Sequence, residues 1–97
     1  MIVVRDIFQV KFGRMREVLE FGRQLQKSFP GPPERRPRLM TDLVGPYYTL
    51  VMEGTFKDLA DYEKSMSQEM PGMSESYHKN FVPMIDSGRR EIFTIVE

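Results

Sequence analysis

Apolar and polar residues recur along this chain with two different periods, which divide it into strands and helices. β-Branched residues dominate residues 2–10, which have the length of a strand. Apolar residues then recur at helical spacing. Turn signals such as Gly45-Pro46 and Pro71-Gly72 separate the later segments. The predicted strands are residues 2–10, 39–44, 47–56 and 89–96, and the predicted helices are residues 15–29, 59–70 and 73–82.

The order of these segments predicts the fold class. A β-α-β-β-α-β order is that of the ferredoxin-like, or split βαβ, arrangement. It implies an α+β fold with a four-stranded antiparallel sheet in the order 4-1-3-2 and both helical segments on one face. The second helix is broken in two. With 97 residues, the chain is expected to form a single domain over residues 1–97.

Local signals predict where several elements begin and end. Thr55 is followed three residues later by Asp58, which resembles a capping box and predicts the N-cap of the second helix at Thr55. Gly22 lies on the apolar stripe of the first helix, where glycine costs about 1 kcal/mol relative to alanine. We therefore expect this helix to approach the sheet closely. Gly88 is expected to precede the last strand, and residues 30–37, rich in proline, predict a stiff exposed loop.

Both faces of the predicted sheet carry apolar residues. In the third strand Val51 belongs to one phase, whereas Leu50 and Met52 belong to the other. A sheet with one solvated face would alternate cleanly, and an apolar patch of this size is unusual on a monomer. We therefore expect a homodimer formed through the helix-free sheet face. Two sheets packed in this way would make a dimeric α/β barrel with a cavity between them.

Composition argues against several classes of function. The chain has 14 Lys and Arg against 14 Asp and Glu, and this neutrality argues against a nucleic-acid partner. It has no Cys and one His, which leaves no thiolate or multi-histidine metal site. No apolar run approaches about 18 residues, and the first residues lack the pattern of a signal peptide. The expectation is a cytoplasmic protein with no membrane association, metal or cofactor.

Two junctions in the sequence resemble those of a known structural superfamily. Val10-Lys11-Phe12-Gly13, followed by Met15 and Glu17, is similar to the strand-to-helix junction of NIPSNAP-type and antibiotic-biosynthesis-monooxygenase-type domains. Phe12 stands where those families commonly have Pro. Phe56-Lys57-Asp58-Leu59-Ala60-Asp61-Tyr62 is similar to their second junction. The resemblance implies a dimeric α/β barrel with a cavity for a small ligand. The haem-degrading branch typically uses an Asn, a Trp and a helical His, and the absence of Trp here argues against that activity.

Two ionisable residues are candidates for catalysis. Glu53 interrupts an apolar strand, and if it were buried its pKa would rise, so that it could act as a general base. Alternatively, it pairs with an Arg on a neighbouring strand. His78 lies beside the apolar stripe that contains Tyr77 and Phe81, where it could act as a base near neutral pH or as an axial ligand. The alternative is an exposed helical His that covers a seam.

Aromatic and charged residues are candidates for ligand contacts. Tyr47 and Tyr48 either line a cavity for a planar ligand or supply strand propensity and packing. Tyr77 is a further candidate. Arg5 belongs to a group of charged residues on strands that should be adjacent. The group consists of Arg5, Asp6, Arg89 and Glu91. It forms either cross-strand ion pairs or a polar patch that orients an anionic or phenolic ligand.

Three hypotheses about function follow. The leading one is a NIPSNAP-like dimeric barrel protein that binds a small apolar or aromatic ligand between sheet and helices. Its enzymatic version is a cofactor-independent monooxygenase with Glu53 or His78 as the base. The alternative is a non-catalytic dimerisation or interaction module whose barrel is filled by side chains. The third, haem binding through His78, is the least favoured by the residues.

Overall fold

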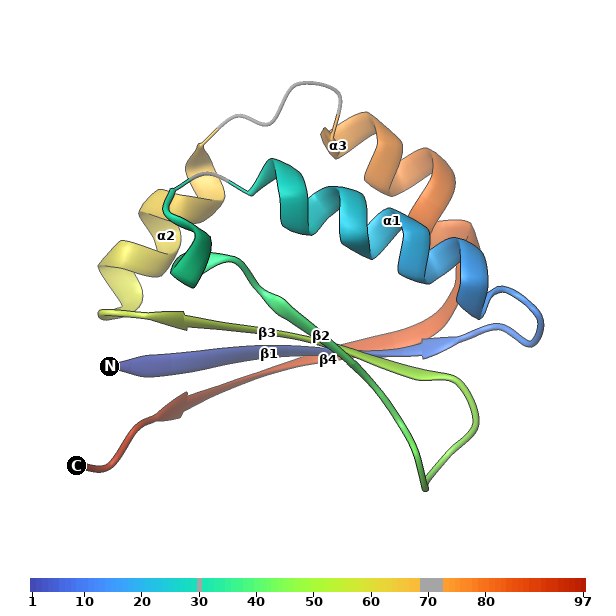
Figure 1. The fold of residues 1–97 in the computed structure, drawn as a ribbon, viewed down its shortest axis with the longest axis horizontal. Coiled ribbons are helices and arrows are strands. Elements are labelled where there is room, and N and C mark those ends of the chain that lie inside the picture. Colours follow the sequence, from blue (N-terminus) through green and yellow to red (C-terminus); the bar gives the residue numbers. More distant parts are fainter. Residues whose placement is uncertain (30, 69–72) are drawn as a thin grey trace.

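The order of elements and the layers agree with the fold predicted from the sequence. The computed structural model describes residues 1–29, 31–68 and 73–97. Four antiparallel strands form one sheet in the order β2-β3-β1-β4, and the described helices all cover the same face (Figure 1). The strands are β1 Ile2–Val10, β2 Arg38–Thr41, β3 Thr49–Phe56 and β4 Ile85–Thr94. The helices are α1 Met15–Ser28, the 3-10 helix η1 Pro33–Arg35, α2 Leu59–Ser67, α3 Met73–Ser76, the π-helix η2 Tyr77–Phe81 and the 3-10 helix η3 Val82–Met84.

The core lies between the helices and one face of the sheet. Side chains alternate along a strand, and the even-numbered residues of β1 and β3 face the helices. Val18 of α1, Leu50 of β3 and Phe81 of η2 are completely buried. A second, smaller cluster lies under α2 and consists of Val4, Phe29, Phe56 and Tyr62. The odd-numbered residues of β1 and β3 therefore lie on the opposite face, called the open face below.

The close approach expected at Gly22 is confirmed, and its partner is on β2. A Cβ placed on Gly22 would lie 3.1 Å from Cδ1 of Leu39. This distance is shorter than an ordinary van der Waals contact, so the helix can lie this near to the strand only without a side chain at this position.

The hairpin between β2 and β3 is longer than predicted, because both strands are shorter. β2 ends at Thr41 instead of residue 44, and β3 begins at Thr49 instead of Tyr47. Oδ1 of Asp42 accepts a hydrogen bond of 2.8 Å from the backbone N–H of Thr49 and closes the loop. Tyr48 has a φ of +64°, a left-handed conformation that interrupts an extended strand. Local turn chemistry therefore outweighed the strand propensity of the loop's apolar residues.

The predicted start of the second helix was wrong. Thr55 remains in β3, and the N-cap is Asp58, whose Oδ1 accepts a hydrogen bond of 2.8 Å from the backbone N–H of Asp61. A carboxylate at this position can cap a helix as well as a hydroxyl group can. Leu59, Tyr62 and Met66 occur at helical spacing in this segment, but only Tyr62 is buried, whereas Leu59 and Met66 are exposed.

The last strand begins earlier than predicted. β4 starts at Ile85 and continues through Gly88, which was expected to precede it. Gly88 pairs directly with Phe8 of β1. A Cβ on Gly88 would lie 2.9 Å from Cδ1 of Phe8, so this glycine makes room for an aromatic ring on the helix-covered face.

Other predictions concern the loops and helix ends. The predicted end of the second helix at Met70 and its stop at Pro71-Gly72 lie outside the described residues, as does Pro30. Within residues 31–37, Arg35 forms an ion pair of 2.6 Å with Asp61 of α2.

No helix in the described ranges is both long enough and apolar enough to cross a membrane.

Candidate functional site

An ion pair lies on the helix-covered face of the sheet, among apolar residues. Asp6 of β1 and Arg90 of β4 are directly opposite each other in the sheet. Nε of Arg90 donates a hydrogen bond of 2.6 Å to Oδ1 of Asp6. This hydrogen bond is the main reason why the pKa of Arg90 is raised. The side chain of Arg90 is 53% exposed, so the pair places a charged hydrogen-bonding group at the solvent-accessible edge of the space between the sheet and the helices.

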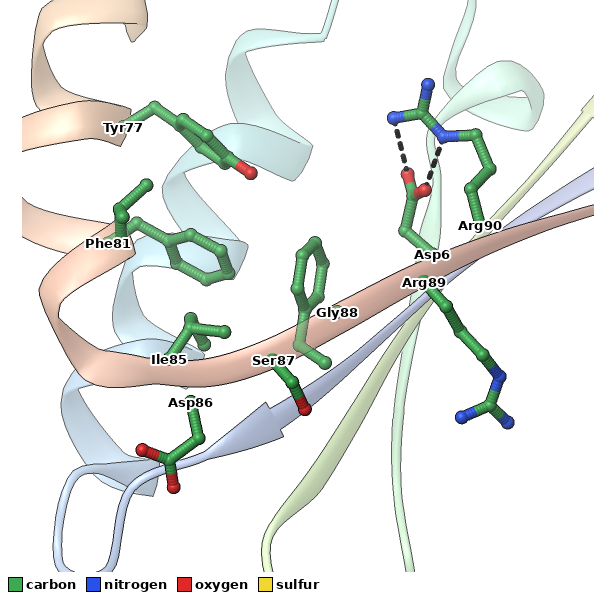
Figure 2. Close-up of a pocket in the computed structure, with 11 residues that line it drawn as sticks. Asp6, Tyr77, Phe81, Ile85, Asp86, Ser87, Gly88, Arg89 and Arg90 are labelled. Atoms are coloured by element: carbon green, nitrogen blue, oxygen red, sulfur yellow. Dashed lines mark hydrogen bonds and ion pairs between the residues drawn. The ribbon is translucent and has the colours of Figure 1, made fainter.

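An outer groove of about 450 Å³ lies on one side of this pair. Tyr77 and Phe81 project from η2 over β4, and the Asp6–Arg90 pair lies across from them (Figure 2). The rings of Tyr77 and Phe81 stack with centroids 5.1 Å apart. Gly88 forms part of the floor. The groove therefore combines aromatic walls with several charged residues, because Asp86 and Arg89 line it as well as the Asp6–Arg90 pair. Apolar walls with a few polar groups are typical of small-molecule sites.

An inner cavity of about 130 Å³ lies on the other side, under α2. Its walls are mainly apolar and include Leu25, Phe29 and Met52. Asp6 lines this cavity as well as the outer groove. Asp6 therefore lies in the wall of both the outer groove and the inner cavity, which are together called the cleft below.

Tyr62 lines the inner cavity together with the charged residues Asp6 and Arg35. It is 9% exposed, and its hydroxyl group is buried with no hydrogen-bond partner among the described residues. The guanidinium carbon of Arg90 lies 5.7 Å from the centre of its ring. Burial raises the pKa of Tyr62, while the charge of Arg90 partly opposes this rise. The phenol is therefore neutral near pH 7 and can donate or accept one hydrogen bond.

Of the residues proposed from the sequence as ligand contacts, Tyr77 lies in the cleft. Tyr47 and Tyr48 lie on the β2–β3 loop instead. Their rings surround Phe12, with centroid distances of 6.4 Å and 5.1 Å from it. Tyr47 is 75% exposed, and neither tyrosine lines the groove or the cavity described above.

Glu53 lies on the open face, away from the cleft, and of its two predicted alternatives the one with a raised pKa was wrong. The residue is buried, and burial by itself would raise its pKa. Hydrogen bonds and positive charge from Arg38 and Arg5 more than offset this effect and lower the pKa below its usual value. Nε of Arg5 lies 2.9 Å from Oε2, and Nη2 of Arg38 lies 2.6 Å from Oε1. The alternative made from the sequence, pairing with Arg on neighbouring strands, is confirmed.

His78 is exposed on η2, next to the ring of Tyr77, at a centroid distance of 5.5 Å. It does not line the outer groove or the inner cavity. Arg5 lies on the open face with Glu53. Of the two alternative candidates for the base, the structure therefore places His78 beside Tyr77 but outside the cleft, and Glu53 on the opposite face of the sheet. No group of three or more potential metal ligands occurs in the described part of the chain.

Sequence reasoning missed Arg90 and the role of Tyr62. Asp6 was visible as the one polar residue in the even phase of the first strand, Ile2–Val10. Arg90 lies at a helix-facing position of the last strand. A charged residue at a helix-facing position of both the first and the last strand was therefore the signal in the sequence that could have predicted this pair. The unpaired hydroxyl of Tyr62 could not be read from the sequence, because it depends on which neighbours surround the ring.

Comparisons with known proteins identify the fold. Models of known protein families give no match, and curated proteins give no significant match. Solved structures match over the whole chain. A NIPSNAP-like domain protein from Burkholderia xenovorans is 20% identical, with a TM-score of 0.80 over 98% of this chain and 84% of its own. A NIPSNAP family protein from Agrobacterium tumefaciens is 16% identical, with a TM-score of 0.79 over 99% and 93%. A structure of an antibiotic biosynthesis monooxygenase is 17% identical, with a TM-score of 0.75 over 100% of both chains.

The chain has the fold that these NIPSNAP-like and monooxygenase-like proteins share. At this level of identity the likeness concerns the fold alone and does not extend to the chemistry of this chain.

Proposed function

We propose that this NIPSNAP-like chain binds a small, mainly apolar or aromatic molecule in the cleft between the sheet and the helices. The observation that carries this proposal is Tyr62, which lines the inner cavity and whose hydroxyl group is buried without a partner among the described residues. A buried polar group without a partner costs about 1–3 kcal/mol. A ligand atom that forms a hydrogen bond with this hydroxyl would remove that cost.

The dimensions and charges of the cleft narrow the class of ligand. The inner cavity of about 130 Å³ is close to the ~150 Å³ of an apolar cavity that holds one benzene ring. The outer groove of about 450 Å³ extends the available space. Arg90 can donate to a carbonyl or phenolate oxygen, and Asp6 can accept from a hydroxyl group. The best fit is a molecule of one or two rings that carries a phenolic hydroxyl or a carbonyl group.

The proposal includes a homodimer formed through the open face of the sheet. Apolar side chains are partly exposed on this face in the single chain. They include Val3, Ile7, Met40, Val51 and Phe93. Such a surface is favourable to bury against a second sheet. The ligand cleft lies on the other face, so each subunit would hold its own ligand.

Oxygenation of a bound phenolic compound by O₂, without a cofactor, is the second candidate function. The whole-chain likeness to an antibiotic biosynthesis monooxygenase favours it. In this case Asp6, instead of Glu53 or His78, would be the carboxylate closest to the substrate. Oxygen uptake with a panel of hydroquinones tests this activity, and the absence of uptake with compounds that bind would restrict the function to binding.

The binding proposal is tested with phenol, 1-naphthol and 2-naphthol as probes, by two-dimensional NMR of the labelled protein. We expect shifts of the amide signals of α2, β4 and η2. Tyr62→Phe should weaken binding about fivefold to tenfold, because one hydrogen bond to the ligand is lost. Tyr47→Phe is the matched control, since it removes the same atom from an exposed ring.

Two results would contradict the proposal. The first is the absence of shifts with every probe at millimolar concentration, which would favour the non-catalytic interaction module. The second is an equal effect of Tyr62→Phe and Tyr47→Phe, which would place the bound molecule outside the inner cavity.

A further inference from the structure

Four charged residues of alternating sign form one row across the open face. Arg38 of β2 is directly opposite Glu53 of β3, and Glu53 is directly opposite Arg5 of β1. Arg5 is in turn directly opposite Glu91 of β4. The row therefore reads positive, negative, positive, negative from one edge of the sheet to the other. We call these four residues the charge row.

The inner and outer residues of the charge row differ in how completely they are paired with opposite charges within the chain. Glu53 is 8% exposed and receives hydrogen bonds from both Arg5 and Arg38. Although Arg38 donates to Glu53, its side chain is 70% exposed. Glu91 is half-buried and has a long contact of 3.9 Å with Arg89. The outer members at the two edges, Arg38 and Glu91, therefore keep capacity for a further partner of opposite charge.

The order of signs is complementary to itself after one particular rotation. A two-fold axis that runs along the strands, midway between β1 and β3, exchanges the two edges of the sheet. It brings Arg38 of each copy opposite Glu91 of the other, and Arg5 opposite Glu53. We propose that the charge row docks a second copy of this chain and sets the direction of the two-fold axis. This inference rests on the homodimer proposed above.

Sheets that pack face to face with aligned strands allow one other choice, an axis that runs across the strands. If that axis followed the charge row, each residue would face its own copy, Arg38 against Arg38 and Glu53 against Glu53. If it were displaced along the strands, the charges would be buried against apolar residues. The first arrangement brings like charges together across the interface, and the second gives Arg38 and Glu91 no opposite charge on the other copy, so both are less favourable than the axis along the strands.

The neighbouring apolar residues agree with the axis along the strands. Ile7 of β1 and Val51 of β3 are paired within the sheet and lie two residues beyond the charge row on the same face. The same rotation that matches the charges brings Ile7 of each copy against Val51 of the other. One axis therefore satisfies both the polar and the apolar parts of the face.

A charge-exchange experiment tests the direction of the axis. Arg38→Glu alone would place two carboxylates opposite each other at each edge, and Glu91→Arg alone would place two guanidinium groups there. We expect each single variant to weaken the dimer at least about 30-fold. An equimolar mixture of the two should form a heterodimer near the wild-type affinity, because both edge contacts are then complementary. The double variant should also recover the homodimer. Light scattering over a dilution series measures the mass in each case.

The same variants control for repulsion between like charges within one subunit. In the double variant, the new Glu at position 38 still faces Glu53 and the new Arg at position 91 still faces Arg5 within the chain. Recovery of the dimer by the double variant can therefore come only from contacts between copies. If a wild-type dimer forms but neither the mixture nor the double variant recovers, the axis is wrong while the homodimer stands. If the wild-type chain is a monomer at all concentrations, both the homodimer and this inference are wrong, whereas ligand binding is tested separately.

Cross-linking provides a second measurement if a charge variant does not fold. The chain has no natural Cys, so Arg38→Cys and Glu91→Cys each add a single thiol. A bis-maleimide reagent with a span of about 10 Å matches the spacing of packed sheets. We expect cross-linked dimers from the mixture of the two variants and few from either alone. Efficient cross-linking of Arg38→Cys to itself would instead support the axis across the strands and overturn the proposal.

Discussion

At the scale of single residues, the two faces of the sheet carry separate charge pairs. Arg5 and Asp6 are neighbours in the sequence but point to opposite faces, because side chains alternate along a strand. Asp6 pairs with Arg90 in the ligand cleft, and Arg5 pairs with Glu53 on the open face. Adjacent residues of β1 therefore serve the proposed ligand site and the proposed dimer interface.

The pKa of Glu53 predicts how stability depends on pH. Because this pKa is lower in the folded chain than its ordinary value of 4.5, folding favours the ionised carboxylate. The stabilisation is fully present above about pH 5 and is lost as the pH falls through the lowered pKa. We expect Glu53→Gln to reduce the free energy of unfolding by about 1–3 kcal/mol at pH 7.

Urea unfolding at a fixed protein concentration, at pH 7 and below pH 4, measures this dependence. The difference between the wild type and Glu53→Gln should shrink in acid. Glu63→Gln, the same change at an exposed position of α2, is the control. A difference that stays constant from pH 7 to the acid range would contradict the assignment.

The hydroxyl group of Tyr62 predicts an unusual mutation. Replacing a buried Tyr by Phe usually removes a hydrogen bond and destabilises a protein by about 1 kcal/mol. Since this hydroxyl has no partner among the described residues, Tyr62→Phe should leave thermal stability unchanged or raise it slightly in the absence of ligand. A clear loss of stability in calorimetry would mean that the hydroxyl is hydrogen-bonded in the folded chain.

At the scale of elements, short-range hydrogen bonds decide the ends that hydrophobic periodicity leaves open. Asp42 closes the β2–β3 loop, and Asp58 begins α2. Asp61 of α2 accepts from the backbone N–H of Lys57 as well as from Arg35. These contacts lower the pKa of Asp61, the bond from Lys57 having the largest effect. Several Asp carboxylates therefore determine how α2 is attached to the sheet and to η1.

The two possible N-caps of α2 can be distinguished by mutation. Asp58→Ala should reduce the free energy of unfolding by about 1 kcal/mol, because the N–H of Asp61 loses its acceptor. Thr55→Ala should have a smaller effect, since Thr55 is an exposed residue of β3. Chemical unfolding of both variants provides the measurement. A larger loss from Thr55→Ala would restore the cap predicted from the sequence.

At the scale of the whole molecule, the sheet has one face whose apolar residues are covered by helices and one face whose apolar residues are not covered. The helices cover the even-numbered residues of β1 and β3, whereas the open face keeps apolar side chains around a row of charges. Burial of such a face needs a partner that matches both kinds of residue. In the proposed homodimer, a second copy of the chain would supply both.

Introducing a charge on the open face tests the homodimer without altering the charge row. Ile7→Glu should convert the dimer to a monomer and leave probe binding by each subunit largely intact, because the cleft is on the other face. Phe12→Glu is the matched control, since Phe12 is 78% exposed and lies in the turn between β1 and α1, outside the strands of the sheet. Sedimentation velocity measures both variants, and an unchanged Ile7→Glu dimer would mean that copies associate elsewhere.

The sequence by itself determined the class of fold, the strand order and the two-sided apolar character of the sheet. These depend on the period of apolar residues and on the short connections between segments, which are local properties. It also made the Gly22 approach and an Arg partner for Glu53 predictable. The sequence shows that Glu53 is ionisable. Whether its pKa rises or falls depended on whether one or two Arg side chains form hydrogen bonds with it.

Only the tertiary structure decided which candidates share a site. Asp6, Tyr62 and Arg90 come from β1, α2 and β4, and their proximity is set by strand register and by the packing of α2 on the sheet. Tyr47 and Tyr48 left the predicted strand because an Asp42 turn and a left-handed residue ended it early. The spacing of apolar residues predicts which of them lie on the same face of a strand or helix. Contacts between distant segments determine which of those residues surround the unpaired hydroxyl group of Tyr62.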